Sequence, residues 1–187
     1  DAARAGKIPV ICSVRDSVQQ RSEDRETETI AWLRQYYSKV LVHGDEHFIP
    51  FGDSFGRVGE IADLLKYTGF VDTARKTQGQ TPLHAVPEVL VSAGGGSAGE
   101  SLYLAAAEAS SRSRHVSVPW RILAGTRPEP AFASRLKEIG SARLTVEANR
   151  PDFRDLLGEC RLSVSQAGYN SVVDLLSSGA PVLLSPF

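Results

Sequence analysis

A glycine-rich segment, Val89 to Leu102, has the residue types of a phosphate-binding turn. It reads VLVSAGGGSAGESL: an apolar run, three glycines, Ser97, a further glycine and then a helix-like stretch. Glycines let the backbone approach an anion closely, and the first N–H groups of a following helix point at it. Ser97 can cap that helix or donate its hydroxyl to a phosphate oxygen. The segment therefore predicts a bound phosphate, and the alternative is a tight turn without a ligand.

The pattern Gly94, Gly96, Gly99 fits the dinucleotide fingerprint G-x-G-x-x-G. That fingerprint also needs an acidic residue about 20 residues further on, to bind the ribose hydroxyls. No acidic residue lies between Glu108 and Glu129, although Arg127 would suit the 2′-phosphate of NADP, so an NADP-binding oxidoreductase stays open. No G-K-[ST] follows the glycines, which excludes the P-loop of nucleoside triphosphate enzymes.

A second constellation lies near the end of the chain, in SVSQAGYNSVVDLLSSGAPVLLSPF. A strand is expected to end at Gln166, and Gly168 marks a turn into a helix that starts near Asn170 and Ser171. These two residues supply capping groups and donors for an anion. Asp174 lies on the same predicted helix face, where it can accept hydrogen bonds from ribose hydroxyls. The alternative is a capped helix whose acidic residue favours the helix dipole.

Apolar runs alternate with helical patterns along the chain. In the second half, strands are expected at 88–93, 120–125, 142–148, 161–166 and 181–186, with helices at 97–110, 131–139, 152–158 and 170–178. In the first half, strands are expected at 8–14 and 39–44, and helices at 24–37 and 58–67. Apolar strands joined by helices predict an α/β fold with a Rossmann-like parallel sheet and helices on both faces. Ligands of such sheets bind at the carboxyl ends of the strands, where both motifs lie.

The polar segment 72–87 has two prolines and no periodicity, so we expect a linker there. It separates a partial Rossmann-like domain, 1–71, from a second domain, 88–187. The chain has no methionine, and it ends in a run that resembles a buried strand, from which we expect a fragment truncated at both ends.

Composition narrows the possible functions. The net charge of −1 shows no basic excess, which argues against nucleic acid as a partner. No apolar run has the length of a transmembrane helix. Cys12 and Cys160 are expected to be buried thiols of a cytoplasmic protein. The histidines and acidic residues show no metal-ligand spacing, so no metal is expected. His43 lies at a predicted strand end and is a candidate for a catalytic base.

The motifs GGGSAGES, AGT and SQAGYNSVVDLLSSGAPVLLSPF resemble the donor-binding domain of GT-B glycosyltransferases. The resemblance covers roughly residues 67–187 and is strongest to family 28, the group of the bacterial N-acetylglucosaminyltransferase that completes the lipid-linked peptidoglycan precursor. The first half resembles the later strands of the acceptor-side domain, as in a group of uncharacterised bacterial glycosyltransferases. The resemblance implies two Rossmann-like domains and a nucleotide-sugar, usually UDP-linked, bound to the second.

The resemblance also implies a nucleotide site. Its residues would be Gly95, Gly96, Ser97, Ala98 and Gly99 at the diphosphate, Thr126 in the same pocket, Ala148, Asn149 and Arg150 at the base, Gln166, Gly168, Asn170 and Ser171 flanking the diphosphate, and Asp174 at the ribose. Asp174 stands where the family usually has the longer glutamate. The family's general base would precede residue 1, and its motif for the donor sugar would follow Phe187.

The implied activity is hexosyl transfer from a UDP-sugar to an unknown acceptor, without a cofactor. A lipid-linked acceptor would bring the protein to the inner face of the membrane. A nucleotide-sugar epimerase or hydrolase on the same fold is the main alternative, and a binding module without catalysis is another. This fragment would hold much of the nucleotide site and would be inactive alone.

Overall fold

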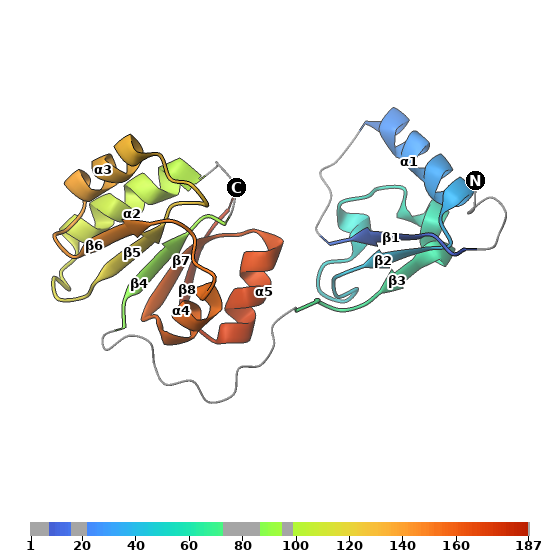
Figure 1. Ribbon diagram of the computed structural model, residues 1–187. Helices are drawn as coiled ribbons and strands as arrows, with labels where there is room; N and C mark the ends of the chain where they lie inside the picture. The colour runs from blue at the N-terminus through green and yellow to red at the C-terminus, as the bar shows by residue number, and fades with distance from the viewer. Residues whose placement is uncertain (1–7, 16–21, 73–86, 95–98, 187) are drawn as a thin grey trace. The chain divides into compact units, whose positions relative to one another are not determined.

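The computed structural model describes residues 8–15, 22–72, 87–94 and 99–186. The chain divides into two compact units, Asp1–Thr73 and Ala74–Phe187 (Figure 1). Most of the segment expected to be a linker, 72–87, lies outside the described residues. The two units are therefore described one after the other.

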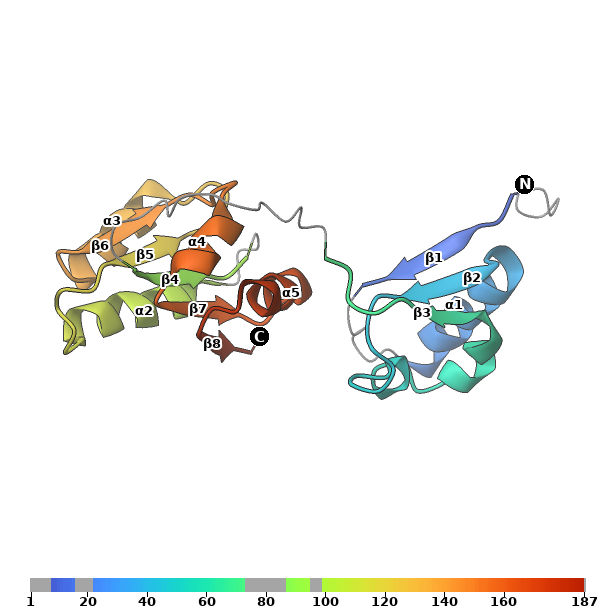
Figure 2. The same cartoon turned by 90° about the horizontal axis from the view of Figure 1, so that it is seen from below.

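Unit 1 contains a parallel sheet in the order β1-β2-β3, seen side by side in Figure 2. The strands are β1 (Ile11–Val14), β2 (Lys39–Val42) and β3 (Leu65–Tyr67), connected by α1 (Glu23–Tyr36) and by two 3₁₀ helices, η1 (Phe51–Asp53) and η2 (Val58–Leu64). Val14, Val42 and Tyr67 lie opposite one another in the register. The carboxyl ends of all three strands therefore meet at one edge.

One face of this sheet carries the core of unit 1. Ile30 and Leu33 of α1 and Ile61 of η2 pack with the buried Val40 and Val42 of β2. Side chains alternate between the faces of a strand, so Ile11 and Ser13 of β1 lie on the opposite face, where Ile11 is 51% exposed. The described helices of unit 1 thus bury one face of its sheet.

The prediction of a single helix over 58–67 was wrong in its second part. The helical segment is a 3₁₀ helix that ends at Leu64, and Leu65–Tyr67 forms the strand β3 beside β2. A three-residue strand gives almost no period-two signal, and two adjacent leucines continue an apolar helical pattern equally well. Pairing with β2, a long-range contact, decides the conformation.

Unit 2 contains a five-stranded parallel sheet in the order β6-β5-β4-β7-β8. Its strands are β4 (Val89–Ser92), β5 (Trp120–Leu123), β6 (Leu144–Glu147), β7 (Leu162–Gln166) and β8 (Val182–Ser185). Its helices are α2 (Glu100–Arg112), α3 (Pro130–Ile139), α4 (Phe153–Glu159) and α5 (Tyr169–Ser178). The predicted α/β fold with a parallel sheet is confirmed.

Helices cover both faces of the unit 2 sheet (Figure 1). Tyr103 of α2 and Leu136 of α3 are buried in the cluster on one face, and Leu157 of α4 and Leu175 of α5 are buried in the cluster on the other. The chain moves outward from β4 through β5 to β6, then crosses to β7 on the opposite side of β4. This change of direction places a topological switch point at the carboxyl ends of β4 and β7, where ligands of such sheets bind.

The last strand differs from its prediction. The run that resembles a buried strand forms β8 at the edge of the sheet, where Leu183 is 59% exposed and Val182 and Leu184 are exposed too. β8 pairs with β7 along one side only, and apolar composition alone does not distinguish an edge strand from a central one.

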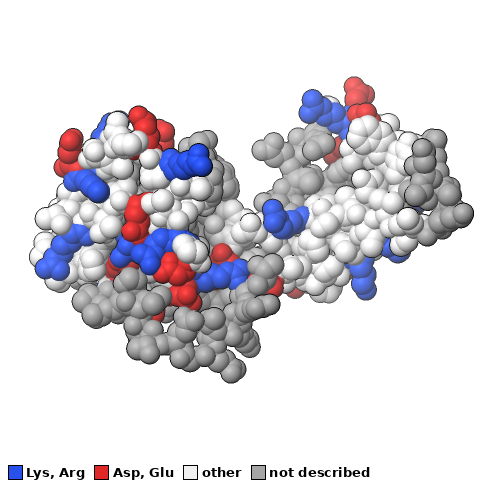
Figure 3. Space-filling view, viewed as in Figure 1, with Lys and Arg blue, Asp and Glu red and all other residues white. Residues whose placement is uncertain are grey.

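The surface charge is mixed. On the face shown in Figure 3, basic and acidic side chains are interspersed with wide uncharged areas, in keeping with the net charge of −1. Within the described ranges, no helix combines the length and apolar composition needed to cross a bilayer.

Candidate functional site

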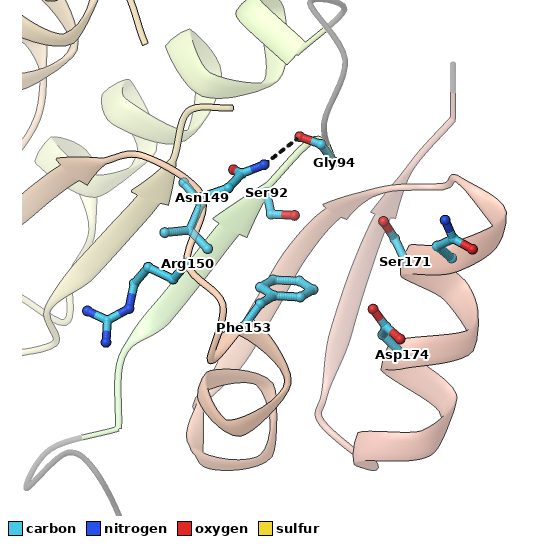
Figure 4. A pocket seen from close by; sticks show the side chains of 9 residues that line it. Ser92, Gly94, Asn149, Arg150, Phe153, Ser171 and Asp174 are labelled. Carbon is cyan, nitrogen blue, oxygen red and sulfur yellow. Dashed lines mark hydrogen bonds between the residues drawn. The ribbon is translucent and has the colours of Figure 1, made fainter. Parts of the chain in front are cut away.

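A pocket of about 220 Å³ lies at the carboxyl edge of the unit 2 sheet, on the face covered by α4 and α5 (Figure 4). Its lining comes from three strand-end regions and two helices: Ser92, Gly94, Leu123, Asn149, Arg150, Phe153, Asn170, Ser171 and Asp174. Pockets for whole drug-sized ligands typically measure about 300–1,000 Å³. The volume between the described residues therefore suits part of a nucleotide, such as a ribose with a phosphate.

Asn149 holds three strand-end loops together at the pocket. Its side-chain oxygen accepts a hydrogen bond from the Gly125 N–H (3.2 Å), and its backbone N–H donates to the Gly125 carbonyl (2.8 Å). Its side-chain amide donates to the Gly94 carbonyl (3.4 Å), as Figure 4 shows. The asparagine thus links the loop after β6 to the ends of β5 and β4, and it fixes the backbone at the start of the glycine turn.

Helix α5 begins earlier than the sequence pattern predicts. Gly168 is the N-cap residue, and the first intrahelical bond runs from the Val172 N–H to its carbonyl (2.9 Å). The prediction that Asn170 and Ser171 cap this helix was wrong, because both lie inside its first turn. Their side chains line the pocket instead. The N–H groups of a first turn have no intrahelical acceptor, so the start of α5 retains the donors that an anion requires.

Asp174 projects into the pocket from the next turn of α5 (Figure 4). Its side chain is 15% exposed, and its Oδ1 forms an ion pair with Nη2 of Arg154, at 2.5 Å. Arg154 belongs to α4, so this pair joins the two helices that cover this face of the sheet. A carboxylate has two oxygens with about four acceptor positions, so one carboxylate can take part in several interactions at once.

Arg150 is directed away from the pocket centre (Figure 4). Its guanidinium donates two hydrogen bonds to the Asp152 carboxylate, at 2.8 and 2.5 Å, and lies 3.5 Å from Glu147. The hydrogen bonds to Asp152 raise the pKa of Arg150 above its usual value, against a smaller opposing effect of burial. The side chain therefore fixes the loop after β6.

The pocket brings together five of the predicted site residues: Asn149, Arg150, Asn170, Ser171 and Asp174. Gly95, Gly96, Ser97 and Ala98 lie outside the described residues. Gly99, Thr126, Ala148, Gln166 and Gly168 are described but do not line the pocket. Gln166 follows the side-chain alternation of β7 onto the other face of the sheet, where its buried Oε1 has no hydrogen-bond partner among the described residues.

Sequence reasoning missed four lining or supporting residues. Ser92 and Leu123 belong to apolar strands and carry no signal apart from their position next to a strand end. Phe153 lines the pocket from α4, and Arg154, the next residue, supports Asp174. Arg154 and Asp174 are 20 residues apart on different helices, so no local spacing connects them.

The histidines, cysteines and carboxylates of the described residues form no group of three or more that could hold a metal ion. The pocket instead offers helix N–H groups, two serine hydroxyls, amides and one carboxylate. These groups suit a ligand that carries phosphate and sugar hydroxyls.

No protein-family model matches the chain, and no curated protein is detectably similar to it. Solved structures are similar in fold. They include the calicheamicin glycosyltransferase CalG4 (TM-score 0.59, 16% identity, 98% of this chain and 50% of that chain). They also include Anabaena Alr3699/HepE in complex with UDP-glucose (0.64, 16%, 94% and 53%). A Listeria monocytogenes protein assigned as a UDP-N-acetylglucosamine 2-epimerase is similar too (0.57, 15%, 96% and 57%).

These likenesses show that the chain has the GT-B fold of such glycosyltransferases, with two Rossmann-like units. The chain spans about half the length of these structures. The narrower resemblance to family 28 stays a prediction.

Proposed function

We propose that unit 2 is the donor-binding domain of a glycosyltransferase that binds a UDP-sugar and transfers its hexosyl group to an acceptor hydroxyl. One observation carries the proposal: Asn149, at the end of β6, and Asn170, Ser171 and Asp174, at the start of α5, line one pocket at the switch point of the sheet. The GT-B fold supports it, since one neighbour holds UDP-glucose.

Each group has a role that follows from its chemistry. The N–H groups at the start of α5 and the Ser171 hydroxyl stabilise the diphosphate, which gains negative charge as it leaves the sugar. The Asp174 carboxylate accepts hydrogen bonds from the ribose hydroxyls. Asn149 connects the base-binding loop to Gly94 and Gly125 through its side-chain hydrogen bonds. The glycine turn 95–98 would contact the same diphosphate.

An epimerase that uses the same nucleotide is the second candidate, supported by the fold of the Listeria protein. Both activities need this donor site, and they differ in whether a second molecule accepts the sugar. An NADP-binding oxidoreductase would use the glycine turn but would leave the α5 residues of the pocket without a role.

The test of the proposal is calorimetric titration of the intact protein with UDP and with 2′-deoxy-UDP. We expect UDP to bind more tightly, and we expect Asp174→Ala to weaken UDP binding about ten- to hundredfold, since a hydrogen bond to a charged group contributes about 1.5–3 kcal/mol. The variant should also lose the preference for UDP over 2′-deoxy-UDP. Asp155→Ala is the matched control, because Asp155 lies on α4 outside the pocket lining and should leave the affinity unchanged.

Binding of NADPH without binding of UDP would reject the donor site. Equal affinities of the wild type and Asp174→Ala for UDP would remove the ribose role of Asp174.

The ion pair from Arg154 makes a further prediction for this site. Arg154→Met removes the guanidinium that holds one oxygen of the Asp174 carboxylate. We expect UDP affinity to fall about two- to fivefold, a modest effect because Arg154 is 39% exposed and such pairs contribute about 0.4–1 kcal/mol. Arg154→Lys, which keeps the charge, should recover part of the loss. An affinity in Arg154→Met equal to that of the wild type would show that Asp174 is held by other contacts.

A further inference from the structure

A chain of alternating charges runs from the interior of the unit 2 sheet to the loop after β6. Arg121, on β5, donates to the carboxylates of Glu88 and Glu147, each at 2.5 Å. The same oxygen of Glu147, Oε1, lies 3.5 Å from Nη1 of Arg150, and Arg150 donates in turn to Asp152. The Glu147 carboxylate is thus shared by one arginine of the sheet and one arginine of the loop.

These charges lie on the sheet face that carries the pocket. Side chains alternate between the faces of a strand, so Arg121 shares a face with Leu123, which lines the pocket. Glu147 is the last residue of β6 and stands directly opposite Leu123 in the parallel register of β5 and β6. The network therefore flanks the pocket on the side of β6, at the point where the base-binding loop begins.

The base-binding loop, residues 148–152, connects β6 to α4 and sets several groups of the pocket. Asn149, whose side chain connects the ends of three strands, lies within it. Asp152 is the N-cap residue of α4, so its position determines where that helix begins. The first residues of α4 are Phe153, which lines the pocket, and Arg154, which pairs with a carboxylate of the pocket. A shift of the loop would therefore displace groups on two sides of a bound nucleotide.

The cost of burying these charges argues for a positioning role. β5 lies inside the sheet, where the side chains of parallel strands are usually apolar, yet the Arg121 side chain is only 14% exposed. A buried ion pair adds little stability compared with apolar side chains of the same volume, because desolvation offsets the attraction. Charge-assisted hydrogen bonds do fix the positions of their partners closely. What the network supplies beyond stability is a fixed position for the loop at its outer end.

We propose that Glu147 is a positioning residue of the nucleotide pocket: its carboxylate, shared by Arg121 and Arg150, holds the base-binding loop in the conformation that binds the base. The inference rests on the proposed function and deepens it, since it assigns part of the affinity for the base to a residue outside the pocket lining. Replacing Glu147 leaves Arg121 with its bond to Glu88. Arg150 retains its two bonds to Asp152, so unit 2 should still fold.

The experiment compares two ligands that differ only in the base, UMP and ribose 5-phosphate, by calorimetric titration of the intact protein. The ratio of their affinities measures what the base contributes. We expect Glu147→Gln to lower that ratio about three- to tenfold, within the range for positions that act on a site without touching the ligand. The lost negative charge changes the attraction for phosphate equally for both ligands, so this effect cancels in the ratio.

Glu138→Gln is the matched control, because Glu138 is exposed on α3, which covers the opposite face of the sheet. It makes the same chemical change and should leave the ratio at the wild-type value. Arg150→Met removes the loop partner of Glu147. If Glu147 acts through Arg150, the double variant should show the ratio of Arg150→Met alone and not the product of the two losses.

Amide hydrogen exchange separates the order of the loop from the stability of the fold. The Asn149 N–H donates to the Gly125 carbonyl (2.8 Å) and reports on the loop, and the N–H of the fully buried Val91 reports on the centre of the sheet. Glu147→Gln should speed exchange at Asn149 and leave the exchange at Val91 unchanged.

Each outcome decides a different statement. A ratio in Glu147→Gln equal to that of the wild type would overturn the inference. Equal acceleration of exchange at Asn149 and Val91 would also overturn it, because Glu147 would then support the fold as a whole. A wild type that binds UMP no more tightly than ribose 5-phosphate would overturn it too and leave the phosphate and ribose part of the donor site intact. Failure of the wild type to bind UDP, UMP or ribose 5-phosphate would reject the proposed function, and this inference with it.

Discussion

Replacing Arg121 with methionine is expected to lower the free energy of unfolding of unit 2 by about 3–5 kcal/mol, the cost of breaking a buried ion pair from one side. Arg121 lies on β5, its side chain is 14% exposed, and its guanidinium donates to the carboxylates of Glu88 and Glu147, each at 2.5 Å. Burial lowers the pKa of Arg121, and the hydrogen bonds that it donates to the two glutamates outweigh that effect, so its pKa lies above the usual value.

The size of the expected loss comes from the carboxylates that remain. The side chain of Glu88 is 9% exposed, so it cannot recover the solvation of a surface glutamate once Arg121 is gone. Arg112→Met is the matched control, because Arg112 is 80% exposed and its ion pair with Glu108 spans 3.5 Å. The control should cost less than about 1 kcal/mol.

Urea unfolding of the intact protein measures the stability loss in Arg121→Met and in Arg112→Met. Amide hydrogen exchange of β4, β5 and β6 locates the change. The combination of Glu88→Gln and Glu147→Gln with Arg121→Met should recover part of the loss, since it removes the buried charges together. Equal stability of Arg121→Met and Arg112→Met would show that the carboxylates are solvated after all.

Local sequence patterns predict most of the fold because its strands are apolar and its helices are bounded by glycines and prolines. Pro130 begins α3 and Gly179 ends α5 in the left-handed conformation, and both boundaries can be predicted from residue type. β3 and the exposure of β8 could not be predicted in this way. Their conformation and burial depend on which strand lies beside them, and that information is not local.

The candidate site, like the fold, could be predicted only in part from local sequence patterns. Ser171 and Asp174 could be predicted to lie near the end of β4, because the carboxyl ends of parallel strands share one edge, and Asn149 was expected there from the resemblance alone. The partners of the site residues could not. Arg154 reaches Asp174 from another helix, and Ser13 reaches His43 across 30 residues. Such pairs depend on the tertiary packing of side chains, which a local sequence motif does not specify.

Replacing Gly99 with alanine is expected to destabilise unit 2 by about 1–3 kcal/mol, the usual cost of forcing an extra methyl group into a packed interior. A Cβ at Gly99 would lie 2.3 Å from the Cβ of Ala93 and 2.8 Å from the ring of Tyr103. Ala93 follows β4, and Tyr103 belongs to α2 and is 4% exposed. The glycine therefore permits the close contact of helix and strand that the third glycine of a nucleotide-binding turn provides.

The clash cannot be relieved by a small rotation, because the Ala93 Cβ is fixed to the backbone of the strand. Tyr103 also accepts a hydrogen bond from the Ala93 N–H through its hydroxyl oxygen, at 3.2 Å, so a shift of the ring would break that bond.

Gly158→Ala makes the same chemical change in α4, where a Cβ would meet nothing within 4 Å. Alanine is the better helix former by about 0.8–1 kcal/mol, so that control should be neutral or stabilising. Thermal unfolding of both variants, with UDP affinity measured beside it, gives the comparison. If Gly99→Ala were as stable as Gly158→Ala, α2 would have room to move away from β4, and the glycine would be required for the ligand alone.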